Sequence, residues 1–142
     1  VGHQGYLTDP DTLELLDKMQ FESIRLGEIN RNPALMEPVL RDADLISIDT
    51  SVIQGSDHVA HAEAGPNGID ARTMCQLARY AGMSDQMKAI GIFEHNPDLD
   101  NRNLGAQLIG QVVWHVLDGI YAQKSDYPEV WTGRICTLRG RP

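Results

Sequence analysis

The chain has 142 residues, a formal net charge of −8 and 42% hydrophobic residues, values typical of one ordinary globular domain or of a part of a larger one. Its mean hydropathy is −0.31, and no apolar run approaches the roughly 18 residues of a membrane-spanning helix. The acidic balance excludes a nucleic-acid or anionic-membrane surface, because such a surface needs clustered lysine and arginine. We therefore expect a small molecule or another protein subunit as the partner.

The first forty residues predict the end of one strand, a second short strand and two helices. Residues 1–6 indicate the end of a strand that runs into a loop, and Asp9-Pro10 opens a helix that continues to Met19. A short strand is predicted around residues 21–26. Asn32-Pro33 then starts a second helical segment toward Leu40.

Two buried strands follow, and each ends at a carboxylate. Residues 44–49 are apolar and β-branched and end in Asp49, while residues 88–93 form a similar run that is followed by Glu94. Between the first strand and the next helix, residues 50–69 show no sustained period and carry several glycines. A connection of that length inside a compact domain is usually functional or disordered, and we interpret this one as a long ordered loop.

The remaining helices are predicted from caps and periodicity. Asp70 is a good N-cap for a helix that ends at Gly82, and a longer helix is expected from Asn103 to Ala122. The inner stripes of these two helices are expected to be Met74, Leu77, Ala78 and Ala81 in the first, and Ile109, Val112, Val113, Val116 and Ile120 in the second. About four strands alternating with helices indicate a mostly parallel α/β fold, whose ligands bind beyond the carboxyl ends of the strands.

The cysteines and the first residue bear on where the chain works. Cys75 and Cys136 lie far apart and have neither metal-site nor redox spacing, so we expect reduced, structural thiols in a cytoplasmic protein. The sequence starts at Val1 with neither an initiator methionine nor a secretory segment, which favours a fragment of a longer protein.

Three motifs resemble a known family when they are taken in order. They are Ser47-Ile-Asp49-Thr-Ser51, Gly65-Pro-Asn-Gly-Ile69 before a helix, and Phe93-Glu94-His-Asn96-Pro97 followed by Asp100. Their order and spacing resemble the C-terminal half of the ureohydrolases (arginase, agmatinase and formimidoylglutamase), with formimidoylglutamase-like members the most similar. The resemblance divides the chain into residues 1–127, the C-terminal portion of a ureohydrolase-like domain, and residues 128–142, an irregular tail.

The resemblance implies a fold, a cofactor and a reaction. The fold is an arginase-like three-layer α/β/α arrangement with two manganese ions at the strand ends, in a protein that is commonly a homo-oligomer. A metal-bridging hydroxide attacks the carbon of a small-molecule amidine or guanidinium substrate. The resemblance places the family's other metal ligands in the first half of its fold, in a glycine-rich segment that ends in Asp-His and in an Asp-Ala-His-x-Asp segment. This chain contains neither segment. We therefore expect a missing N-terminal half and no activity from the isolated chain.

Asp49 and Ser51 carry the expected metal chemistry. Asp49 matches the first aspartate of the family's Asp-x-Asp motif, which implies a metal ligand, although an aspartate that ends a buried strand could equally cap the next turn. Ser51 stands where the second metal aspartate should be. A neutral hydroxyl removes one negative charge from the site, so the second metal should bind weakly or not at all.

Glu94 and the glycine-rich loop carry the expected substrate contacts. Glu94 matches the glutamate that faces the substrate's cationic group, and a carboxylate suits a planar cation because it accepts two parallel N–H bonds. A capping or surface acid is the alternative interpretation. Asn67 and Gly68 are expected to hold substrate from the loop. His95 occupies a position that is usually aliphatic, and the sequence gives this substitution no meaning.

The other histidines have weaker claims. His58 and His61, beside Asp57, form a conceivable replacement pair of metal ligands, but histidines three apart bind one metal best on a helix. Since this stretch is expected to be loop, the sequence favours ordinary solvated histidines. His3 lies at a strand end from which it could approach the site, whereas His115 lies inside the last helix and is expected to be structural.

Two hypotheses remain open. The first is a part of a metal-dependent C–N hydrolase acting on linear amidines such as formimidoylglutamate. The second is a catalytically degenerate ureohydrolase relative that acts as a binding or interaction subunit. Ser51 favours the second, while the retained Asp49, Glu94 and glycine-rich loop favour the first.

Overall fold

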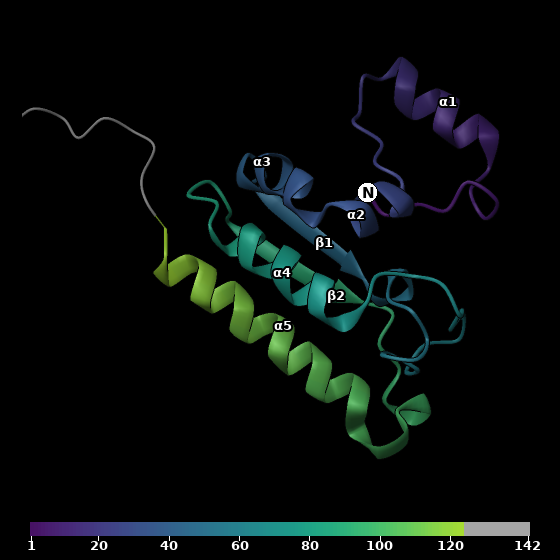
Figure 1. Ribbon diagram of the computed structural model, residues 1–142, viewed down its shortest axis with the longest axis vertical. Coiled ribbons are helices and arrows are strands. Elements are labelled where there is room, and N and C mark those ends of the chain that lie inside the picture. The colour runs from purple at the N-terminus through teal and green to yellow at the C-terminus, as the bar shows by residue number, and fades with distance from the viewer. Residues whose placement is uncertain (124–142) are drawn as a thin grey trace, which may run out of the picture.

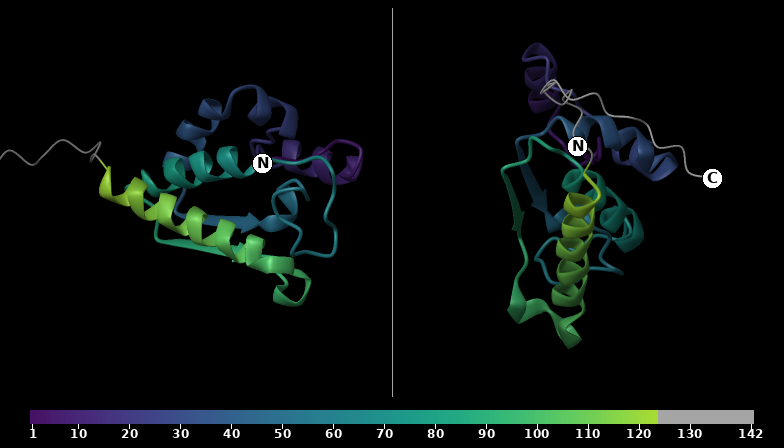
Figure 2. Two further views of the ribbon diagram at one scale, coloured as in Figure 1. Left: turned by 60° about the horizontal axis from the view of Figure 1, so that its bottom comes forward. Right: turned by 90° about the vertical axis from the view of Figure 1, so that its left-hand side faces the viewer.

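The computed structural model describes residues 1–123, in which a small parallel sheet carries helices on one of its faces (Figures 1 and 2). The sheet has the order β1-β2, with β1 at Leu45–Asp49 and β2 at Ala89–Phe93. The register runs from Leu45 opposite Ala89 to Asp49 opposite Phe93. The predicted tail at residues 128–142, with Cys136, lies outside the described residues.

Besides the two strands, residues 1–123 form five α-helices and four short 3₁₀ turns. The helices are α1 (Pro10–Lys18), α2 (Leu26–Arg31), α3 (Met36–Arg41), α4 (Ala71–Gly82) and α5 (Leu104–Tyr121). The 3₁₀ turns are η1 (Pro33–Leu35), η2 (Thr50–Val52), η3 (Pro97–Leu99) and η4 (Asn101–Asn103). Within the part of the chain that the structure describes, no helix is both long and apolar enough to cross a membrane.

The first segment departs most from the sequence-based prediction. The strand expected at residues 21–26 is wrong: only Arg25 forms an isolated parallel bridge, to His3, and Leu26 begins α2. Phe21 is 58% exposed, so it has no sheet to pack against. Of the roughly four strands expected, residues 1–123 contain two, together with a second isolated bridge between Ile53 and Ile69.

Helix α4 forms where the sequence predicts it. Asp70 caps the helix, because its Oδ1 accepts the N–H of Thr73 at 2.6 Å. The four residues of its expected inner stripe are buried, which confirms that prediction. Cys75 is also buried and unpaired, and burial raises the pKa of its thiol.

Helix α5 packs closely against α4 through two glycines. A Cβ on Gly82 would lie 2.1 Å from the carbonyl oxygen of Val116, and one on Gly119 would lie 2.3 Å from that of Arg79. The expected inner stripe of α5 is partly wrong, because Val113 and Ile120 are 45% and 42% exposed. Leu108, which the sequence did not single out, is buried with Val112 and Val116.

The core lies between the sheet and the helices on one side of it. Its buried members include Leu26, Ile29, Met36, Ile53, Ile69, Met74, Leu77, Leu108, Val112 and Val116. On the other face of the sheet, Leu45 is 69% exposed and Phe93 is 54% exposed, and Figure 2 shows α4 and α5 on the opposite side of the strands. Residues 1–123 therefore form two layers of an α/β fold.

Candidate functional site

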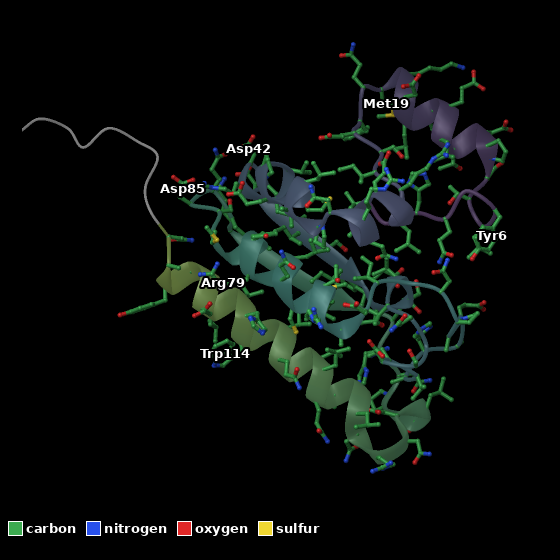
Figure 3. All side chains as sticks on the ribbon, viewed as in Figure 1. Tyr6, Met19, Asp42, Arg79, Asp85 and Trp114 are labelled. Atoms are coloured by element: carbon green, nitrogen blue, oxygen red, sulfur yellow. The ribbon has the colours of Figure 1, made fainter. Side chains whose placement is uncertain are left out.

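The two parallel strands place Asp49 and Glu94 at the same edge of the sheet. Asp49 is the last residue of β1 and pairs in register with Phe93, so Glu94 follows one residue beyond it. Both acids are exposed. Figure 3 shows Asp42 and Asp85, which precede the strands, at the end of the molecule opposite Tyr6. The carboxyl edge is where open α/β sheets bind ligands.

The Asp49 side chain caps the turn that follows β1. Its Oδ1 accepts the backbone N–H of Ser51 at 2.9 Å, and η2 begins at the next residue. Asp49 Oδ2 has no hydrogen-bond partner among residues 1–123. The turn-capping interpretation of Asp49 is thus correct for one oxygen, while the second oxygen is open to a ligand. Ser51 lines a cleft of about 320 Å³, together with Gln4, Tyr6, Leu7, Glu63, Gly65, Pro66 and Asn67.

Glu94 stands in an unusual backbone conformation. Its φ is +66°, a left-handed value that is uncommon outside glycine and costs on the order of 1 kcal/mol. The Glu94 carboxylate forms no hydrogen bond or ion pair within the described residues. Since nothing engages this carboxylate, it is available to a cation at the strand end.

The glycine-rich loop is fixed beside the turn that follows Asp49. A Cβ on Gly68 would lie 2.4 Å from the backbone nitrogen of Gln54, so only glycine allows this approach. Asn67 Nδ2 donates to Gln4 Oε1 at 3.0 Å, and Gln4 Nε2 donates back to the Asn67 carbonyl at 3.3 Å. The structure therefore brings Asn67 and Gly68 close to the segment after β1.

A buried histidine cluster lies between the loops that follow the two strands. His58 Nε2 is 3.2 Å from His95 Nδ1, and the rings of His58 and His61 stack with centroids 5.6 Å apart. His58 is 0% exposed and His61 is 4% exposed. The expectation of solvated histidines is therefore wrong, because the loop folds back and buries both rings. Asp100 Oδ2 lies 3.9 Å from His95 Nε2.

The electrostatics of this cluster favour a neutral His58 imidazole and an ionised Asp100 carboxylate. Burial, with smaller contributions from His95 and His61, lowers the pKa of His58. Burial acts to raise the pKa of Asp100, but the N–H groups of Ala106 and Gly105 and the two nearby histidines lower it overall. Those N–H groups, at 2.8 and 2.9 Å, belong to the first turn of α5, where a carboxylate is stabilised.

Neither the histidine cluster nor the Asp49–Ser51 segment forms a metal site by itself within residues 1–123. Within residues 1–123, no group of three His, Cys, Asp or Glu side chains is arranged to hold a metal ion. Asp49 and the neutral Ser51 together offer a single charged donor. The described residues therefore do not by themselves fit the manganese pair that the family resemblance implies.

His3 lies in the bridge with Arg25, where Ser23 Oγ is 3.4 Å from its Nδ1.

Sequence reasoning missed the joint arrangement of His58, His61, His95 and Asp100. No local pattern unites them, because they come from two segments, residues 58–61 and 95–100, that lie more than thirty residues apart in the sequence. The one available signal was the pair of His58 and His61 in a long loop with a third histidine directly after a strand end. His115, predicted to be structural, is partly buried in α5, and its Nδ1 has no partner among the described residues.

The fold is arginase-like, as the comparisons with solved structures show. No protein-family model and no curated protein matches the chain. Among solved structures, formiminoglutamase from Trypanosoma cruzi, crystallised with Mn²⁺, matches with a TM-score of 0.78 and 16% identity, over 85% of this chain and 43% of that one.

Two Bacillus subtilis enzymes share the same fold. Formimidoylglutamase matches with a TM-score of 0.77 and 22% identity, over 87% of this chain and 41% of that one. Arginase matches with a TM-score of 0.68 and 18% identity, over 77% of this chain and 40% of that one. The chain thus spans less than half the length of the structures that it matches, and the likeness establishes the fold, in agreement with a C-terminal half.

Proposed function

We propose that this chain forms the substrate-facing part of a metal-dependent hydrolase that cleaves C–N bonds of linear amidines or guanidines. The observation that carries the proposal is the placement of Asp49 and Glu94 at the carboxyl ends of adjacent parallel strands. The names of the matched structures, formiminoglutamase, formimidoylglutamase and arginase, support this class of reaction.

Glu94 is the residue to which we assign substrate recognition. An amidinium or guanidinium group is a planar cation whose N–H groups suit a bidentate carboxylate. The Glu94 carboxylate is exposed and has no competing partner within residues 1–123. Asn67 and Gly68, held beside η2, would border the same edge and limit the shape of the substrate.

Asp49 is the residue to which we assign metal binding. When bound, a manganese pair supplies a nucleophilic hydroxide at neutral pH. Asp49 has one open carboxylate oxygen, but the described residues offer no set of three ligands. In this proposal the other ligands come from outside residues 1–123, so we derive no step through the ion from this chain.

A second candidate function is a binding or interaction subunit that keeps the fold without the chemistry. Ser51 favours it, because a hydroxyl replaces the acid that a second metal would need. The two candidates differ in one readout. Release of ammonia, formamide or urea from an amidine panel by the full-length protein with Mn²⁺, abolished by Asp49→Ala, supports the hydrolase. No release from any substrate supports the interaction subunit.

The substrate-recognition step can be tested on the 142-residue chain itself. Agmatine, which carries a guanidinium group, is titrated against the chain and followed by NMR, with butylamine as the matched ligand without that group. We expect Glu94→Gln to weaken agmatine binding about tenfold, because it removes the charge from both hydrogen bonds. Asp85→Asn, which removes an exposed acid before β2 at the other end of the molecule (Figure 3), should leave binding unchanged. Equal binding of agmatine and butylamine would contradict the assignment of Glu94.

A further inference from the structure

A groove between α4 and α5 is separate from the candidate site at the strand ends. Its volume is about 530 Å³, within the range of small-molecule sites. Its polar and thiol groups come from both helices: Arg72, Cys75, Gln76 and Arg79 of α4, and Gln111 and His115 of α5. None of these residues lines the cleft that contains Ser51 and Asn67. The groove is therefore a second cavity with its own chemical groups.

The groove is basic although the chain as a whole is acidic. Its lining includes two arginines and no aspartate or glutamate, whereas the chain has 20 acids against 12 lysines and arginines. Helix α4 contains no acid at all. Its first residue, Ala71, also lines the groove, so the positive end of the helix dipole adds to the attraction for an anion. The groove therefore favours a negatively charged ligand.

Arg79 is held at one end of the groove by α5. Its Nε donates to Asp118 Oδ2 at 2.7 Å, and its Nη1 lies 3.5 Å from Met83 Sδ. These contacts fix the guanidinium beside α5 (Figure 3), while its Nη2 has no partner among residues 1–123. Arg79 thus keeps N–H donors for a ligand in a position that the fold has already set.

Arg72 provides a second cation on the same face of α4. It is exposed, and its guanidinium forms no hydrogen bond or ion pair within the described part of the chain. Arg72 and Arg79 are separated by almost two whole turns, about 10 Å along the helix axis. Between them Cys75, which is 7% exposed, gives the groove an apolar floor. The groove therefore has two cations with an apolar stretch between them.

We propose that this groove binds a linear dicarboxylate, with one carboxylate on Arg72, the other on Arg79 and the methylene chain over Cys75. Arginine suits carboxylates because its planar N–H groups match the two oxygens of the anion. A phosphate ion is too compact to reach two arginines that start about 10 Å apart. The proposal does not rest on the hydrolase function, since it uses neither Asp49 nor Glu94.

The test is an NMR titration of the 142-residue chain with adipate, a six-carbon dicarboxylate, at low salt. We expect a Kd of at most about 1 mM, with shifts at the backbone amides of Arg72, Gln76 and Gln111. Hexanoate has the same length and one carboxylate, while malonate has two carboxylates but is too short to bridge the arginines. Each should bind about tenfold more weakly than adipate, because each loses one charge-assisted contact.

Two pairs of variants locate the site on the groove. Arg72→Gln should weaken adipate binding about tenfold, whereas Arg31→Gln, which removes an exposed arginine of α2, should not. Gln111→Glu adds a carboxylate to the groove and should weaken binding by repulsion. Gln86→Glu adds the same charge in the turn before β2 and should leave binding unchanged. Circular dichroism checks that all four variants keep the fold.

Several results would overturn the proposal. These are a Kd well above about 1 mM, equal affinities for adipate, hexanoate and malonate, or an equal loss in Arg72→Gln and Arg31→Gln. Inorganic phosphate that binds the groove as tightly as adipate would indicate a simple anion site instead. Adipate binding should survive Glu94→Gln, and agmatine binding should survive Arg72→Gln, so failure of this proposal is distinguishable from failure of the proposed function.

Discussion

His58 Nε2 lies 3.2 Å from His95 Nδ1, so one contact between imidazoles ties the loop after β1 to the loop after β2. The loop after β1 carries Asn67 and Gly68, and the loop after β2 begins with Glu94. Anything that protonates or removes these rings therefore acts on both candidate substrate-binding segments at once.

Acidification should destabilise the chain through His58. Its pKa in the folded chain is below the ordinary value of 6.5, chiefly because of burial, so the unfolded chain binds this proton more readily. The stabilisation is present above about pH 6.5 and is lost as the pH falls below that value toward the folded-state pKa. Urea unfolding at about pH 7.5 and about pH 5.5 should give the lower midpoint at the lower pH.

Two single variants check the source of this pH dependence. His58→Phe keeps a buried ring but cannot titrate, so the difference between the two midpoints should shrink. His3→Gln, at the bridge with Arg25, should keep the native difference. An unchanged difference in His58→Phe would mean that another group carries the effect.

The glycine contact between α4 and α5 should be intolerant of a methyl group. In Gly119→Ala the new Cβ would meet the Arg79 carbonyl at 2.3 Å, and we expect a loss of about 1–3 kcal/mol in the free energy of unfolding. Gly110→Ala is the matched control in the same helix, because nothing lies within 4 Å of its Cβ position. That variant should gain about 0.4–1 kcal/mol. Thermal and urea unfolding measure both, and equal effects would contradict the close packing.

Replacing Glu94 by glycine should separate stability from recognition. The φ of +66° suits glycine, so Glu94→Gly should keep or slightly raise the free energy of unfolding, by up to about 1 kcal/mol. The same variant should lose agmatine binding, because the carboxylate is gone. Urea unfolding and the NMR titration report the two effects separately. A marked loss of stability would instead indicate a structural task for this side chain.

Introducing an acid at Ser51 should strengthen Mn²⁺ binding. Asp49 has one open oxygen, and a second carboxylate two residues later would add charge for a divalent cation. We expect the native chain to bind Mn²⁺ weakly and Ser51→Asp to bind it several-fold more tightly, as measured by the loss of the free-ion EPR signal. Ser56→Asp adds the same charge elsewhere in the loop and should have no such effect. Equal affinities in the two variants would rule out a metal role for this position.

The elements with strong local signals were predictable from the sequence. Their signals lie in neighbouring residues of the sequence. These signals are the Asp70 cap and apolar stripe of α4, the apolar runs of β1 and β2, and the helical periodicity of α5. Helix α2 could not be predicted from the sequence, because a helix of six residues is too short to show a period. At its start, Glu28 Oε2 accepts the backbone N–H of Arg25 at 3.3 Å. The strand expected at residues 21–26 failed because Arg25 alone finds a pairing partner.

The candidate site, too, could be predicted from the sequence only in part. Asp49 and Glu94 could be placed from the sequence, because parallel strands bring their carboxyl ends together. The burial of His58 and His61 could not, since it depends on a loop of about twenty residues folding back against α5. A Cβ on Gly105 would lie 3.1 Å from His58 Nε2, which shows that this contact is made between distant segments.

The exposed face of the sheet bears on the aggregation of the isolated chain. Leu45 and Phe93 stand 69% and 54% exposed beside open strand edges, the geometry that templates intermolecular strand pairing. Electrostatic repulsion between chains of charge −8 opposes this, but its range shrinks from about 10 Å at 0.1 M salt to about 3 Å at 1 M. We therefore expect the acids of the isolated chain to oppose its aggregation, and we expect rising ionic strength to promote precipitation through this sheet face.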